Sequence, residues 1–154
     1  MKDPDKWYRE IYDTAKVAID TIAALFEAGE IDTALILAPK GVYDNWIQGE
    51  IPTHLPDRIK HKILRWQPNV SKKFLQELKD FAIPKFREPE TLHLFVMNVE
   101  AFSSGKGAET AMDFLKLNPK SIMIVDESTT IKNRQAQRTK NIIKCGRLCR
   151  YRRI

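Results

Sequence analysis

The chain lacks the features typical of membrane-spanning, secreted and fibrous proteins. Its 154 residues contain no apolar stretch that approaches the roughly 20 residues of a membrane-spanning helix, and no apolar leader follows Met1. Only two cysteines occur, Cys145 and Cys149, which are too few for a disulfide framework or a four-cysteine zinc site. We therefore expect one domain, residues 1–154, that is cytoplasmic and has no membrane partner.

Acidic residues are absent from the last part of the chain, residues 128–154, which carries nine basic side chains. The total is 26 basic and 20 acidic residues, so residues 1–127 hold 17 basic against 20 acidic ones. The excess of positive charge in the chain, +6 overall, therefore comes from the C-terminal segment. A positive field of this kind attracts phosphate backbones. An ordinary solvated helix face remains an equal alternative.

Short apolar runs alternate with helical patterns along the chain. Apolar runs predict strands at residues 34–38, 60–66, 92–97 and 122–125. The first and last have little polar alternation, as expected of strands buried on both faces, whereas 60–66 alternates and predicts an edge strand. Apolar residues at helical spacing predict helices at 15–28, 71–82, 106–117 and 134–149, and an irregular loop is expected at 52–60. This order predicts an α/β fold, a mostly parallel sheet with helices on both faces.

Details of two helices can also be predicted. Ser71 stands where the N-cap of the second helix should lie. Val17 of the first helix and Leu75 of the second belong to the apolar stripes expected to face the sheet.

An acidic pair follows the run at 122–125. Asp126 and Glu127 stand where that strand should end, and ligands of parallel α/β sheets bind at the carboxyl ends of the strands. In nucleotide-hydrolysing proteins such a strand places one carboxylate on Mg²⁺ and another beside the attacking water. The plainer alternative is that Asp126 only caps the next turn.

A second candidate site follows the run at 34–38. Lys40 is placed at the end of this strand and near the start of a helix, where backbone N–H groups can hold an anion. Asn45 and Trp46 follow. The alternative is an ordinary turn in which Trp46 packs into the core.

Three segments together resemble the first RecA-like domain of superfamily-two helicases, most closely the Swi/Snf-type branch. They are Val17-Ala18-Ile19-Asp20-Thr21-Ile22, Leu35-Ile36-Leu37-Ala38-Pro39-Lys40 with Trp46, and Ile124-Val125-Asp126-Glu127-Ser128 through Ile131-Lys132-Asn133. A weaker likeness covers Val96-Met97-Asn98-Val99-Glu100, and the resemblance extends from about Lys16 to Ile154. It implies a three-layer RecA-like fold of the P-loop NTPase type.

The resemblance also implies roles for individual residues. Asp126 would hold Mg²⁺ and Glu127 would position the hydrolytic water of an ATP-dependent enzyme. DNA is the implied partner, and its backbone would contact Lys40 and its neighbour Asn45. The basic residues after the acidic pair, namely Lys132, Arg134 and Arg138, are further candidates for contact with nucleic acid.

The chain departs from the family where ATP phosphates would be held. Members carry Gly-x-Gly-Lys-Thr before the first helix, whereas this chain has Ile11-Tyr12-Asp13-Thr14-Ala15 and no glycine before Gly29. A phosphate cradle needs glycines so that successive N–H groups converge. Thr14 or Lys16 could supply one function each, but neither rebuilds the cradle. A second glycine-containing stretch, Ser103-Ser104-Gly105-Lys106-Gly107, has the wrong spacing and predicts a turn.

These departures lead to the functional hypothesis. The chain stops at Ile154, where the family continues into a Leu-Thr-Gly-Thr-Pro motif and a second RecA-like domain that supplies an arginine finger. We expect a fragment or degenerate copy of the first motor domain of an ATP-dependent DNA helicase or translocase, with no significant ATPase by itself. The alternatives are a non-catalytic nucleic-acid-binding module and a module that self-associates through a sheet edge.

Overall fold

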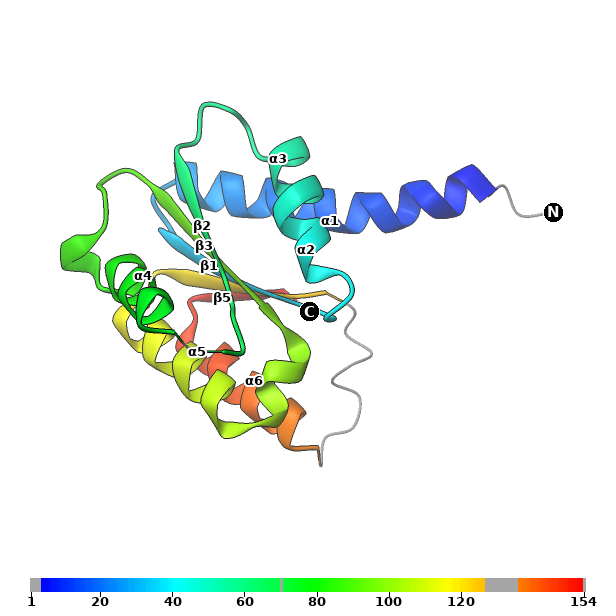
Figure 1. Ribbon diagram of the computed structural model, residues 1–154. Helices are drawn as coiled ribbons and strands as arrows, with labels where there is room; N and C mark the ends of the chain where they lie inside the picture. The colour runs from blue at the N-terminus through cyan, green and yellow to red at the C-terminus, as the bar shows by residue number, and fades with distance from the viewer. Residues whose placement is uncertain (1–3, 70, 127–135, 154) are drawn as a thin grey trace.

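The computed structural model describes residues 4–69, 71–126 and 136–153, with backbone alone for residues 4–14. Its helices and strands follow the predicted alternation (Figure 1). The strands are β1 Thr33–Ala38, β2 His61–Arg65, β3 Leu92–Asn98, β4 Ser121–Val125 and β5 Tyr151–Arg153. The α-helices are α1 Pro4–Glu27, α2 Tyr43–Asn45, α3 Ile51–His54, α4 Lys72–Ala82, α5 Gly105–Leu117 and α6 Gln137–Leu148. A π-helical turn spans Trp46–Glu50, and 3₁₀ turns span Pro84–Phe86 and Val99–Ser103.

The five strands form one sheet in the order β2-β3-β1-β4-β5, and all its pairings are parallel. The α/β fold with a parallel sheet is thereby confirmed. The strand predicted at 60–66 is β2, which lies at one edge as expected, and β1 and β4 are buried along their whole length. Strand β5 was not predicted; it forms the opposite edge.

Alternate residues of each central strand face opposite layers. Leu35 and Leu37 of β1 belong to a core formed with α4, α5 and α6, whereas Ala34, Ile36 and Ala38 pack against α1 and the helical segment after β1. In Figure 1 the first three helices lie on one side of the sheet and the last three on the other. The molecule therefore has three layers, as in a RecA-like fold.

Some local predictions need correction. Val17 and Leu75 are 44% and 43% exposed, because neighbouring positions such as Ile19 and Phe74 occupy the core instead. The loop expected at 52–60 begins as helix α3, in which Pro52 stands in the first turn, where its missing N–H costs no hydrogen bond. The N-cap prediction is confirmed: the Ser71 hydroxyl accepts a hydrogen bond from the Phe74 amide at 3.1 Å.

Candidate functional site

The carboxyl ends of three neighbouring strands bring the candidate residues together. Strand β1 lies between β3 and β4, and all three run in the same direction. Lys40 follows β1, Glu100 follows β3 and Asp126 follows β4, so these residues stand along one edge of the sheet. We call this group the carboxyl-edge site.

Asp126 lies directly at the end of β4. Its backbone N–H donates to the Leu37 carbonyl at 2.8 Å, which extends the pairing of β4 with β1 by one residue. Its carboxyl Oδ2 accepts a hydrogen bond from the Trp46 indole Nε1 at 2.9 Å. The side chain therefore has a fixed direction at the strand end. Its predicted partner Glu127 lies outside the described residues.

Trp46 is only 2% exposed, so it packs into the core, as the alternative interpretation of this turn stated. The same indole also reaches the acidic strand end 80 residues later in the chain. Because a buried indole N–H needs an acceptor, Asp126 satisfies a group that the fold would otherwise leave unpaired. Trp46 therefore both packs into the core and fixes the position of the Asp126 carboxylate.

Lys40 is held through its backbone. Its N–H donates to the two carboxylate oxygens of Glu100 at 3.1 and 3.3 Å, and the Asn98 side-chain amide donates to the same carboxylate at 3.2 Å. The Lys40 residue itself is exposed. Glu100 therefore fixes the turn after β1 while the Lys40 side chain stays accessible to solvent.

Glu100 stays ionised in this position. Burial acts to raise its pKa, but hydrogen bonds from its own backbone amide, Asn98 and Lys40, with the positive charge of Arg138, together lower the pKa below its usual value. The resulting carboxylate accepts from the Lys40 backbone and lies within the positive field of Arg138.

Arg138, at the start of α6, is the second of the predicted basic nucleic-acid contacts that the structure describes. Its Nε donates to the Ser103 hydroxyl at 3.0 Å, which places it beside the turn that follows β3. Asn45 is exposed at the end of α2, where its Oδ1 lies 2.8 Å from the position a Cβ would take at Gly49. The predicted contacts Lys132 and Arg134 lie outside the described residues.

The residues suggested to replace the phosphate cradle lie inside a helix. Helix α1 runs without a break from Pro4 to Glu27, so the backbone amides of residues 11–16 are used in helical hydrogen bonds rather than aimed at a ligand. Lys16 pairs with Asp20 at 2.6 Å, one turn further along the same helix. The side chain of Thr14 lies outside the described atoms. This segment does not fit a triphosphate.

The stretch at 103–107 has a packing role. A Cβ at Gly107 would stand 2.3 Å from the Ala101 carbonyl oxygen, so only glycine allows α5 to approach the preceding turn this closely. This close packing accounts for Gly107, so no role in phosphate binding is needed to explain it.

The residues present fit a magnesium ion only in part. Asp126 offers an oxygen ligand of the kind Mg²⁺ prefers, and this ion commonly uses one or two carboxylates with water and phosphate. Among the described residues, however, no group of three or more histidine, cysteine or acidic side chains could enclose a metal ion. Without a cradle for the phosphates, the described residues do not build a complete site for Mg²⁺ with ATP.

Sequence reasoning missed Glu100 as a site residue. It stood in the weakest of the matched segments, and its partner Lys40 is 60 residues away in sequence. A carboxylate two positions after a buried strand was the available indication, because neighbouring parallel strands end at one edge.

Comparison with known proteins adds no relative to this picture. No model of a known protein family matches the chain, and neither does any curated protein.

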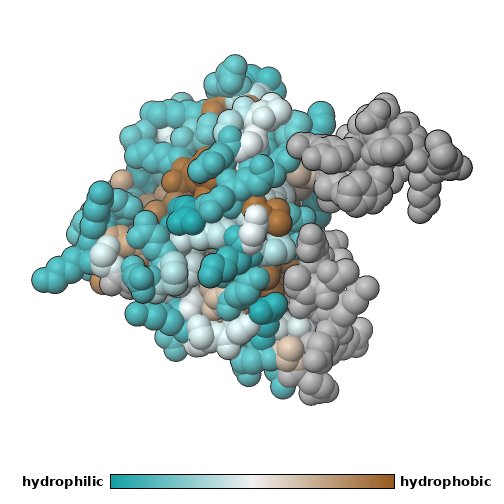
Figure 2. Space-filling model, turned by 45° about the vertical axis from the view of Figure 1, so that its right-hand side comes forward, coloured by the Kyte–Doolittle hydropathy of each residue, from teal (hydrophilic) through white to brown (hydrophobic). Residues whose placement is uncertain are grey.

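Within the part that the structure describes, no helix is long and apolar enough to cross a membrane. On the face shown in Figure 2, brown areas are small and separated by hydrophilic residues.

Proposed function

We propose that this chain is a RecA-like unit related to the first motor domain of Swi/Snf-type helicases, and that its carboxyl-edge site binds a nucleic-acid backbone. The main support is a hydrogen bond that joins two separate segments at that edge. The indole N–H of Trp46, after β1, donates to the carboxylate of Asp126 at the end of β4. Lys40 and Arg138 supply exposed or half-buried positive charge beside it.

We also propose that the isolated chain does not hydrolyse ATP. The support is the unbroken α1, which uses the amides that would have to cradle the phosphates. The measurement is phosphate release with Mg²⁺, ATP and saturating DNA. Turnover at the background rate agrees with the proposal, whereas turnover that Glu127→Gln abolishes would contradict it.

Nucleic-acid binding is tested by fluorescence anisotropy with a labelled single strand and a labelled duplex across a salt series. Affinity should fall with salt, because phosphate contacts release counterions. Lys40→Ala and Arg138→Gln should each weaken binding and reduce the salt slope by about 1. Lys116→Ala is the matched control: it is exposed at the other end of α5, away from the carboxyl edge. Equal losses in all three variants would refute an interface at this site.

Self-association through strand pairing is disfavoured by the two edge strands. Strand β2 exposes His61, Lys62 and Arg65, and strand β5 exposes Arg152 and Arg153. Basic side chains on an edge strand oppose pairing with an identical edge. We therefore expect a monomer, and light scattering at increasing protein concentration measures this.

A further inference from the structure

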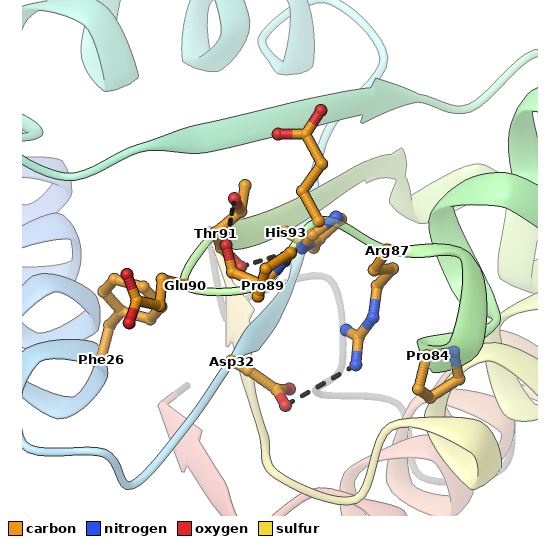
Figure 3. A pocket seen from close by; sticks show the side chains of 9 residues that line it. Phe26, Asp32, Pro84, Arg87, Pro89, Glu90, Thr91 and His93 are labelled. Carbon is orange, nitrogen blue, oxygen red and sulfur yellow. Dashed lines mark hydrogen bonds and ion pairs between the residues drawn. The ribbon is translucent and has the colours of Figure 1, made fainter.

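Two acidic side chains at the amino end of the sheet lie beside cations. A cavity of about 260 Å³ is found there, with walls that include the end of α1, the residue before β1 and the loop that leads into β3 (Figure 3). In this cavity, Arg87 Nη2 lies 3.6 Å from Asp32 Oδ2. The carboxylate of Glu88 pairs with Lys60 and Lys62 at 2.8 and 3.1 Å. Each of these two carboxylates therefore has a positive partner within the protein.

At the carboxyl edge, two carboxylates are held by neutral donors instead. The Glu100 carboxylate accepts from the backbone N–H of Lys40 at 3.1 and 3.3 Å and from the Asn98 side-chain amide at 3.2 Å. The Asp126 carboxylate accepts from the Trp46 indole N–H at 2.9 Å. None of these hydrogen bonds uses a positively charged group.

These hydrogen bonds hold one segment, residues 39–46, from two sides. Because β1 lies between β3 and β4, Glu100 reaches the segment from the β3 side and Asp126 reaches it from the β4 side. Pro39 has no N–H, so the amide of Lys40 is the first donor after β1. The Val42 amide donates to the Pro39 carbonyl at 2.8 Å and closes a turn around Lys40. Glu100 therefore fixes the place of this turn.

The cations of the carboxyl-edge site are not neutralised by carboxylates. Among the residues that the structure describes, no carboxylate forms an ion pair with Lys40 or Arg138. Lys40 and Gly41 are exposed, and a Cβ at Gly41 would have no heavy atom within 4 Å. A phosphate group can therefore reach Lys40 without displacing a carboxylate from it.

We propose that Glu100 is a positioning residue of the nucleic-acid interface: its carboxylate holds the turn after β1 so that the Lys40 ammonium group meets a phosphate of the bound backbone. This inference rests on the proposed function. It predicts an effect opposite to that of charge alone. Removing a negative charge from an anion-binding site should tighten binding by electrostatics, whereas loss of a positioning residue weakens it.

The test is fluorescence anisotropy with a fluorescein-labelled oligothymidine strand. Glu100→Gln should weaken binding at least about threefold, as expected for residues that act through one hydrogen-bond network. Asp44→Asn is the matched control, because Asp44 lies in the same segment but pairs with Arg65 at 2.6 Å rather than with Lys40. Asp44→Asn should tighten binding by up to about twofold, since it removes only a repulsive charge.

A double variant shows whether Glu100 acts through Lys40. Lys40→Ala removes the ammonium group, so Glu100→Gln should no longer weaken binding when it is added to Lys40→Ala. A general disturbance of the site would instead add its loss to that of Lys40→Ala. The ¹⁵N-HSQC spectrum of each variant shows whether it is folded.

The hydrogen bond itself can be measured in the free wild-type chain, so the test does not depend on the folding of a variant. The Lys40 amide should exchange with solvent at least about tenfold more slowly than the Gly41 amide, after correction for intrinsic rates. The Gly41 amide has no backbone acceptor among the described residues.

The outcomes separate this inference from the proposed function. Unchanged or tighter binding by Glu100→Gln, a loss that persists in the Lys40→Ala background, or equal exchange of the two amides would each overturn the role of Glu100. The proposed function would still be supported if Lys40→Ala weakened binding. Absence of binding by the wild-type chain, or unchanged binding by Lys40→Ala, would refute the proposed contact and the role of Glu100 with it.

Discussion

Single side chains connect distant parts of this chain at the carboxyl end of its sheet. Trp46 and Asp126 are joined at 2.9 Å, and Lys40 and Glu100 at 3.1 Å. Sequence alone could indicate Asp126, because it follows an apolar run. It could not reveal the partner of that carboxylate, because the contact depends on which strands are neighbours.

The bond from Trp46 to Asp126 should contribute measurably to stability. Trp46→Phe keeps an aromatic ring but removes the N–H donor, and we expect a loss of about 1.5–3 kcal/mol, the range for hydrogen bonds to charged groups. Urea unfolding at pH 7 measures the change. A loss below about 0.5 kcal/mol would mean that the bond contributes little.

Gly107 and Gly146 are both tightly packed, but against different kinds of neighbour. A Cβ at Gly107 would meet the Ala101 backbone oxygen at 2.3 Å, whereas one at Gly146 would meet the movable ends of Met123 and Arg152 at 2.9 and 3.0 Å. Gly107→Ala should therefore cost about 1–3 kcal/mol. Gly146→Ala should cost less, because the neighbours can move and alanine favours the helix by up to about 1 kcal/mol. Thermal unfolding of both variants tests this order, and the reverse order would contradict it.

Whole elements were predicted where their apolar pattern was long enough. Helices α4, α5 and α6 and strands β1 to β4 lie where expected. Strand β5 was missed because Tyr151–Arg153 is short and mostly charged, and only its pairing with β4 makes it a strand. Helix α3 was missed because Pro52 suggested a loop, although proline is well tolerated in the first turn.

Helix α4 depends on its N-cap. Ser71→Ala removes the hydroxyl that accepts from the Phe74 amide and should cost about 1 kcal/mol. Ser104→Ala is the control, because Ser104 holds the same position before α5 without a capping hydrogen bond. Chemical unfolding should show a clearly larger loss for Ser71→Ala. Equal losses would show that the cap does not stabilise α4.

Glu88 links the loop before β3 to β2. Hydrogen bonds from Lys60 and Lys62 lower its pKa from 4.5 to about 2. The folded state thus favours the ionised form, so this contribution to stability is present above pH 4.5 and is lost as the pH falls toward 2. Glu88→Gln should therefore lose less stability than wild type between about pH 5 and pH 3. Exposed Glu109→Gln is the control; a Glu88→Gln profile parallel to wild type would argue against the link.

In the whole molecule, the two ends of the parallel sheet carry different groups of charged residues. The carboxyl end gathers Asp126 and Lys40, as parallel strands require, and this much followed from the sequence once the strands were predicted. Arg138 reaches this end from helix α6 through its hydrogen bond to Ser103, which the strand pattern did not predict. The amino end gathers Asp32 and Arg87, which no sequence pattern singled out. Their meeting depends on the return of the chain from α4 to β3 beside the start of β1.

Nucleic-acid binding at the carboxyl-edge site is measured most directly by a ¹⁵N-HSQC titration of the chain with a single-stranded oligonucleotide. We expect shifts at the Trp46 indole N–H and at the backbone amides of Lys40, Glu100 and Arg138, with the amino end of the sheet unchanged at low oligonucleotide concentration. Shifts confined to other surfaces, or none at all at low salt, would contradict a nucleic-acid interface at the carboxyl edge of the sheet.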